Sequence, residues 1–155
     1  MNLTCENETD YQIDLDALKA EAVFLISALH LHPDTELSIT LVDSADMEEL
    51  HLEWMREPGP TDILSFPMDE LRPSEDPQPG ILGDIVICPE FVAADPDRAG
   101  MSMVERMAFL LVHGMLHLIG YDHATEDEYE AMFAFQDRLL EQWRLASSAV
   151  GTERG

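Results

Sequence analysis

Basic residues are scarce in this sequence of 155 residues, which has 8 lysines and arginines against 32 aspartates and glutamates, a formal net charge of −24 at pH 7. A chain of this charge repels phosphate groups at long range, and most non-specific affinity for nucleic acids comes from cationic contacts. The eight basic residues are also scattered, so the sequence contains no basic run. Composition alone therefore argues against a protein that binds RNA or DNA through its overall charge.

Cysteines and long apolar runs are scarce as well. The two cysteines, Cys5 and Cys88, are too few for a disulfide framework, and neither lies in a Cys-x-x-Cys metal-binding motif. No segment has the pattern of a signal peptide, and no apolar run approaches the length of a membrane span. We therefore expect a cytoplasmic protein that does not enter a membrane.

Hydrophobic periodicity predicts a mixture of helices and short strands. Their order predicts a single α+β domain over residues 1–145, followed by a disordered tail at 146–155. In the second helix, Met47, Leu50 and Trp54 are expected to form the buried stripe. We expect a short edge strand or coil within 1–12, helices at 13–32, 45–54, 89–95, 102–119 and 126–145, strands at 37–42, 63–66 and 82–87, and an exposed loop at 69–80.

Three histidines are clustered in one stretch, HGMLHLIGYDH, which runs from His113 to His123. The apolar residues before it predict a buried helix, on which His113 and His117 lie one turn apart and project from the same face. Gly120 would end this helix in a left-handed conformation, after which His123 can turn back toward the other two. Three imidazoles and an open fourth position are typical of catalytic zinc sites, so we predict that His113, His117 and His123 bind one Zn²⁺ per chain. Nitrogen ligands would also suit nickel or copper.

The spacing H-x-x-x-H-x-x-G-x-x-H is that of the metzincin peptidases except at one position. In those enzymes a glutamate follows the first histidine and acts as the general base. Here that position is Gly114. A zinc peptidase therefore stays open as an interpretation only if another segment supplies a carboxylate.

The histidine stretch resembles the signature of the YbeY family of bacterial metal-dependent endoribonucleases, also called rRNA maturation factors. Two further segments, PTDILSFP at 60–67 and LGDIVI at 82–87, resemble the family in the same order. The resemblance covers about residues 37–145. It implies a sheet of about four strands with helices around it, a zincin-like metal helix, and a zinc-dependent, single-strand-specific endoribonuclease. It further implies a role in 16S rRNA 3′-end maturation and ribosome quality control, with single-stranded rRNA or the ribosome, and not DNA, as the partner.

The resemblance also suggests roles for individual residues. His113 and His117 would be catalytic as well as metal-binding. Arg56 lies where the family usually has an arginine that is thought to contact phosphate, although a solvated arginine at a helix end explains it equally well. Apart from the resemblance, the missing side chain of Gly114 would leave room beside the metal for a phosphodiester. Asp122 would be either a hydrogen-bond acceptor for a ligand imidazole, or a turn residue or cap of the next helix.

A third interpretation involves no catalysis. In it, a zinc ion holds the last two helices together, and the acidic surface binds a basic ribosomal protein. The charge of −24 favours such a partner. This interpretation is compatible with the nuclease, because an acidic enzyme brought to rRNA by a basic protein would not need strong RNA affinity of its own.

Overall fold

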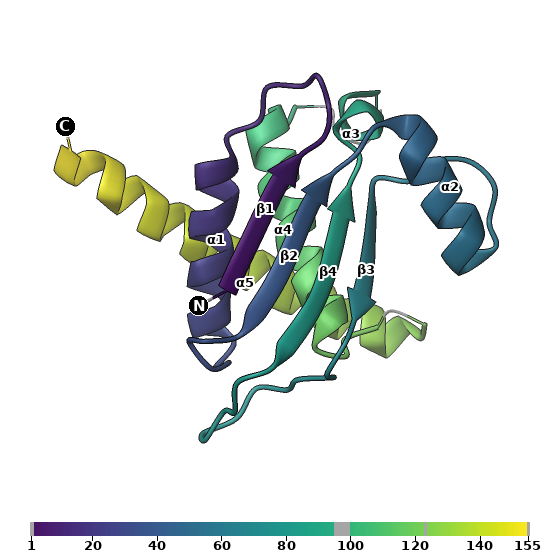
Figure 1. Ribbon diagram of the computed structural model, residues 1–155. Helices are drawn as coiled ribbons and strands as arrows, with labels where there is room; N and C mark the ends of the chain where they lie inside the picture. Colours follow the sequence, from purple (N-terminus) through teal and green to yellow (C-terminus); the bar gives the residue numbers. More distant parts are fainter. Residues whose placement is uncertain (1, 95–99, 123, 155) are drawn as a thin grey trace.

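The computed structural model describes residues 2–94, 100–122 and 124–154. Within these residues, four strands and five helices form the single α+β domain that the sequence predicts (Figure 1). The strands are β1 (Asn2–Asn7), β2 (Glu36–Leu41), β3 (Ile63–Pro67) and β4 (Ile81–Ile87). The helices are α1 (Leu15–Ala28), α2 (Ser44–Met55), α3 (Pro89–Ala94), α4 (Met103–Leu118) and α5 (Glu126–Arg154).

The strands form one mixed sheet in the order β1-β2-β4-β3. β1, β2 and β4 are parallel, and β3 pairs antiparallel with β4 at one edge. In β2, Leu37, Ile39 and Leu41 are buried and the residues between them are partly exposed, as the alternating pattern predicts. The edge strand β3 contacts α4, which brings this edge of the sheet next to the histidine helix.

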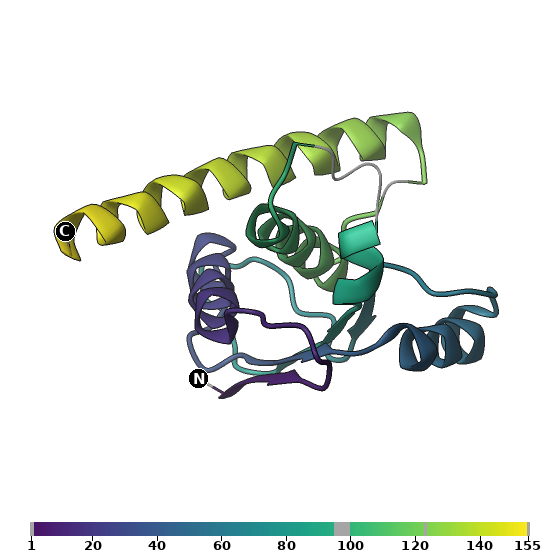
Figure 2. The same cartoon turned by 90° about the horizontal axis from the view of Figure 1, so that it is seen from above.

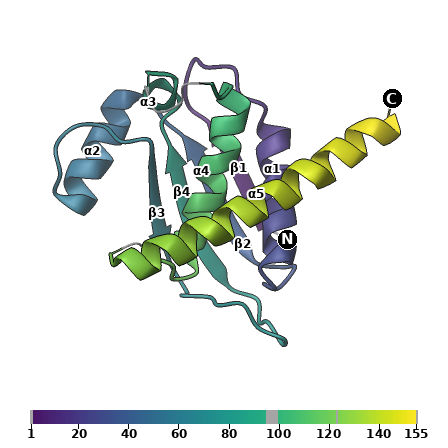
Figure 3. The same ribbon diagram turned by 180° about the vertical axis from the view of Figure 1, so that it is seen from behind.

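Three helices cover one face of the sheet. α1 and α4 lie directly on it, and α5 crosses over both of them (Figures 2 and 3). The main apolar core fills the space between the sheet and these helices, where Leu25, Ile39, Ile85, Leu111 and Met115 are completely buried. Burial of this apolar surface is the main force that fixes α4 against the sheet.

α2 lies beside β3, away from the three-helix layer (Figure 1). Met47 is fully buried in a second, smaller apolar cluster, and Leu50 packs against that cluster. The prediction that Trp54 completes a buried stripe is wrong, because its side chain is 62% exposed. The C-terminal half of α2 extends past the sheet, and the ring of Trp54 lies edge-to-face with that of Phe66, at 5.9 Å between centroids.

The last helix is longer than the sequence pattern predicts. α5 runs to Arg154, so the predicted disordered tail is helical up to that residue. The extension contains no proline, and alanine, which favours helix, occurs in it. Although α5 is long, no helix in the described part of the chain is apolar enough to cross a membrane.

Candidate active site

α4 begins and ends within one residue of the bounds that the sequence predicts. The Ser102 hydroxyl accepts a hydrogen bond from the Glu105 amide at 3.1 Å, which caps the first turn. At the other end Gly120 has φ +101° and the Tyr121 amide donates to the Leu116 carbonyl, the hydrogen bond of a Schellman turn. This turn places the Tyr121 carbonyl close to the last histidine of the helix, His117.

The imidazoles of His113 and His117 meet at their Nε2 atoms, which lie 3.0 Å apart. The two rings are nearly perpendicular, at 84°. Each Nδ1 atom faces an acceptor, since that of His117 is 3.0 Å from the Tyr121 carbonyl and that of His113 is 3.0 Å from Oε1 of Gln136. A carbonyl oxygen only accepts, so both Nδ1 atoms donate and both Nε2 atoms of the neutral rings present lone pairs.

Gln136 orients His113 from another helix. It lies on α5 and is completely buried. Its Nε2 atom donates to the Phe109 carbonyl at 3.4 Å, which fixes which end of the amide faces the imidazole. Because both the oxygen and the nitrogen of the Gln136 amide form hydrogen bonds, burying this side chain costs little free energy. The same hydrogen bond to His113 holds its imidazole in one tautomer.

The geometry of the pair suits a zinc ion. With Zn–N bonds of about 2.0–2.1 Å, two ligand nitrogens of a tetrahedral site lie about 3.3 Å apart. The observed 3.0 Å is close to this value, and two lone pairs at that distance are stabilised by a cation between them. The third predicted ligand, His123, lies outside the described residues, and the residues that are described contain no complete group of three metal-binding side chains. The zinc ligand set stays a prediction.

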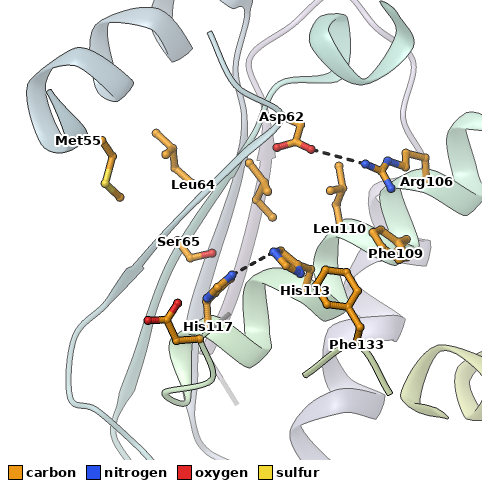
Figure 4. A pocket seen from close by; sticks show the side chains of 12 residues that line it. Met55, Asp62, Leu64, Ser65, Arg106, Phe109, Leu110, His113, His117 and Phe133 are labelled. Atoms are coloured by element: carbon orange, nitrogen blue, oxygen red, sulfur yellow. Dashed lines mark hydrogen bonds and ion pairs between the residues drawn. The ribbon is translucent and has the colours of Figure 1, made fainter. Parts of the chain in front are cut away.

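A cavity of about 740 Å³ opens beside the histidine pair, between α4, β3 and the start of α5. Its volume is in the range of sites that enclose small molecules. Figure 4 shows both imidazoles pointing into it, with Ser65 next to them. The described residues that line it are Met55, Asp62, Ile63, Leu64, Ser65, Arg106, Phe109, Leu110, His113, His117, Asp122 and Phe133.

The prediction that Gly114 leaves room for a substrate is wrong, because side chains of the sheet fill the space next to it. A Cβ atom there would lie 2.9 Å from Cδ1 of Ile63, 3.1 Å from Oγ of Ser65 and 3.3 Å from Cδ1 of Ile85. The glycine is buried and lets α4 approach β3 and β4 closely. Close packing, and not access to the metal, is therefore the physical reason for the missing side chain.

Replacing Gly114 by glutamate should lower the free energy of unfolding by more than about 3 kcal/mol, because it forces a charged side chain into a filled space. Urea unfolding of both proteins measures this difference. Val104→Glu is the matched control, since Val104 lies on the same helix and is 67% exposed. An equally stable Gly114→Glu variant would show that the helix can move away from the sheet without cost.

The other predicted site residues lie at different distances from the cavity. Asp122 lines it, but the acceptor for Nδ1 of His117 is the carbonyl of the preceding residue. Arg56 is exposed at the end of α2, in a left-handed conformation with φ 56°, and is not among the described lining residues, although its neighbour Met55 is. The roles of Asp122 and Arg56 therefore stay predictions.

Sequence reasoning missed Gln136 and Arg106. Gln136 is a polar residue on the last helix, and its complete burial becomes apparent only when α5 packs against α4. Arg106 lies seven residues before His113, so the face it shares with the histidines was visible in the sequence. Its pairing with Asp62, at 3.8 Å, depends on the tertiary fold.

The chain is similar to known endoribonucleases over nearly its whole length. The family model described as Endoribonuclease YbeY matches residues 3–144. The Endoribonuclease YbeY of Thermobifida fusca is 50% identical over 147 residues, which cover 93% of this chain and 95% of that protein. The Endoribonuclease YbeY of Mycolicibacterium smegmatis is 49% identical over 148 residues, which cover 92% of this chain and 83% of that protein.

The fold has a counterpart among solved structures. The solution structure of TM1509 from Thermotoga maritima matches with a TM-score of 0.58 over 95% of each chain, at 21% sequence identity. At this identity the likeness supports the α+β fold alone, whereas the family match and the curated relatives also extend across the histidine helix. The chain belongs to the endoribonuclease YbeY family of nucleases.

Proposed function

We propose that this protein is a zinc-dependent endoribonuclease that cuts single-stranded RNA, and that it acts in the cytoplasm in 16S rRNA 3′-end maturation and ribosome quality control. The observation that carries the proposal is the pair of Nε2 atoms, 3.0 Å apart, that His113 and His117 direct into an open cavity. The endoribonuclease names of relatives about 50% identical support the class of reaction.

His113, His117 and His123 would hold the zinc ion, with the fourth position open to the substrate. Bound there, zinc would supply positive charge next to a phosphoryl oxygen and make a nearby water more acidic. The chain itself keeps the imidazoles in place through Gln136 and the Tyr121 carbonyl. Nickel or copper could replace zinc in vitro, because the ligands are nitrogen atoms.

The walls of the cavity favour a single strand. Phe133 lies beside His113, with 5.7 Å between ring centroids, and stacks on Tyr129 at 4.4 Å. Unpaired bases stack on such aromatic rings, whereas the bases of a duplex are already stacked on each other. A single strand can therefore present both a phosphate and a free base to this cavity.

The partner is expected to be rRNA within a ribosomal particle. A chain with a net charge of −24 should bind free RNA weakly. We infer that a basic ribosomal protein, attracted by the acidic surface, supplies part of the affinity for the ribosome.

Cleavage of an end-labelled single-stranded RNA by the zinc-loaded protein tests the proposal, with the same RNA in duplex form as a control. We expect cutting of the single strand and little cutting of the duplex. Hydrolysis of a peptide library instead would favour the zinc peptidase. If chelation unfolds the protein and neither free RNA nor ribosomes are cut, the non-catalytic interpretation is correct.

Replacing Gln136 by leucine should reduce zinc affinity and RNA cleavage by about 10- to 100-fold, because the imidazole of His113 loses its acceptor. Zinc affinity, from competition with a chelating dye, and the cleavage rate measure the effect. Gln142→Leu is the matched control, because Gln142 lies on the same helix and is exposed. Equal zinc affinity of the Gln136→Leu variant and the native protein would contradict the orienting role.

A further inference from the structure

Arg106 supplies a permanent positive charge to the cavity. It lies seven residues before His113 on the same face of α4, so the two Cα atoms are about 10 Å apart along the helix. Figure 4 shows its side chain beside Asp62, at the end of the cavity away from His117. Among the described lining residues it is the only lysine or arginine.

The guanidinium group is held from two sides. Its NH2 atom is 3.8 Å from a carboxylate oxygen of Asp62, which precedes β3. Its central carbon is 4.7 Å from the centroid of the Phe109 ring, a distance typical of a cation–π contact. The side chain is only 14% exposed, so its position is well defined by these neighbours.

An arginine in this position suits a phosphate group. Guanidinium ions bind phosphate through two parallel hydrogen bonds, and they are less costly to desolvate than ammonium ions. The cavity also contains the carboxylates of Asp62 and Asp122, and the whole chain is strongly acidic, so an RNA strand would otherwise meet mostly negative charge. One buried cation changes the local potential far more than a distant surface charge does.

The separation from the histidines decides which phosphate Arg106 reaches. The phosphate that is cleaved would lie beside the zinc ion that His113 and His117 would hold, whereas Arg106 is directed toward Asp62 at the other end. A strand that follows the cavity would therefore place one phosphate at the histidine pair and a neighbouring one at the arginine.

We propose that Arg106, held by Asp62 and Phe109, binds the phosphate next to the one that is cleaved and so fixes the register of the RNA strand. This inference rests on the proposed nuclease function. It explains how a chain with few basic residues can bind RNA, because the guanidinium group of Arg106 lies in the cavity where the strand binds.

A set of short RNAs, each with one phosphate replaced by an uncharged methylphosphonate, tests the assignment. For the native protein, KM should rise about 10-fold when the neutral group lies next to the cleaved bond, with little change in kcat. Arg106→Gln should raise KM for unmodified RNA by a similar factor and should not respond further to that methylphosphonate. For the Arg106→Gln variant, the slope of log KM against the logarithm of the salt concentration should be smaller than that of the native protein by about 0.7.

Arg106→Lys should recover part of the lost affinity, because it keeps the charge but not the two parallel hydrogen bonds. Zinc content and thermal unfolding of each variant separate a structural defect from a binding defect. If the native protein cuts none of the RNAs, the proposed nuclease function fails. If it cuts them with the same KM at every methylphosphonate position, only the role of Arg106 is overturned. Because this comparison uses the native protein alone, it tests the role of Arg106 even if the Arg106→Gln variant does not fold.

Discussion

Replacing His117 by alanine should lower the rate of RNA cleavage by at least about 100-fold while the chain stays folded. Loss of a group that only orients a metal ligand costs about 10- to 100-fold, so loss of the ligand itself should cost at least as much. The side chain is partly exposed at the cavity, and the core around it is formed by its apolar neighbours, so its removal leaves a small defect. The cleavage rate and the zinc content of the purified variant measure the effect.

His30→Asn is the matched control for this experiment. His30 is exposed, has a left-handed backbone with φ 57°, and asparagine tolerates that conformation. The control should cut RNA at the native rate. If the native protein and the His117→Ala variant cut RNA at equal rates, the activity comes from a contaminating nuclease. That result would remove the support for chemistry at the histidine pair.

Replacing Glu21 by glutamine should stabilise the folded chain at pH 7 by about 3 kcal/mol. Glu21 lies on α1, is 1% exposed, and its Oε2 atom has no hydrogen-bond partner among the described residues. Burial raises the pKa of this carboxyl group from 4.5 to about 9. The unfolded chain therefore releases the proton near pH 4.5, whereas the folded chain keeps it to about pH 9.

The sign of the pH effect follows from these two values. Below pH 4.5 the carboxyl is protonated in both states and costs little, but between pH 4.5 and about 9 unfolding releases a proton, so stability falls as pH rises. Glutamine cannot ionise and removes this loss. Urea unfolding at pH 5, 7 and 9 should show that the variant's gain in the free energy of unfolding grows with pH.

Asp16→Asn, a substitution at an exposed position on the same helix, is the control and should instead lower the free energy of unfolding by up to about 1 kcal/mol. A gain from Glu21→Gln that does not vary with pH would contradict the raised pKa.

Local features of the fold could be predicted from the sequence because a few neighbouring residues determine them. The hydroxyl of Ser102 caps α4, Asp43 caps α2, and Thr125 accepts from the Glu128 amide at the start of α5. Gly120 ends α4 because its left-handed conformation is strained for other residues. The alternation in β2 and the order of the segments were enough to predict the α+β class.

Features that depend on how distant segments pack could not be predicted. The helical spacing of Trp54 indicated burial, but exposure depends on where α2 sits relative to the sheet edge. For Gly114 the sequence shows only the missing side chain, and its contact with Ile63 on β3 appears when the sheet is assembled. The histidine spacing predicted the pair at the site, whereas the hydrogen bond to Gln136 joins residues 23 positions apart.

Removal and return of zinc shows whether RNA cleavage depends on a zinc ion at the histidine pair. The protein is stripped with a chelator, dialysed, and titrated with zinc from zero to two equivalents while cleavage of a labelled single-stranded RNA is followed. We expect no cleavage by the stripped protein, a rise in proportion to added zinc up to one equivalent per chain, and no rise for His117→Ala at any zinc level. Cleavage by the stripped protein at the full native rate would contradict a zinc-dependent nuclease at the histidine pair.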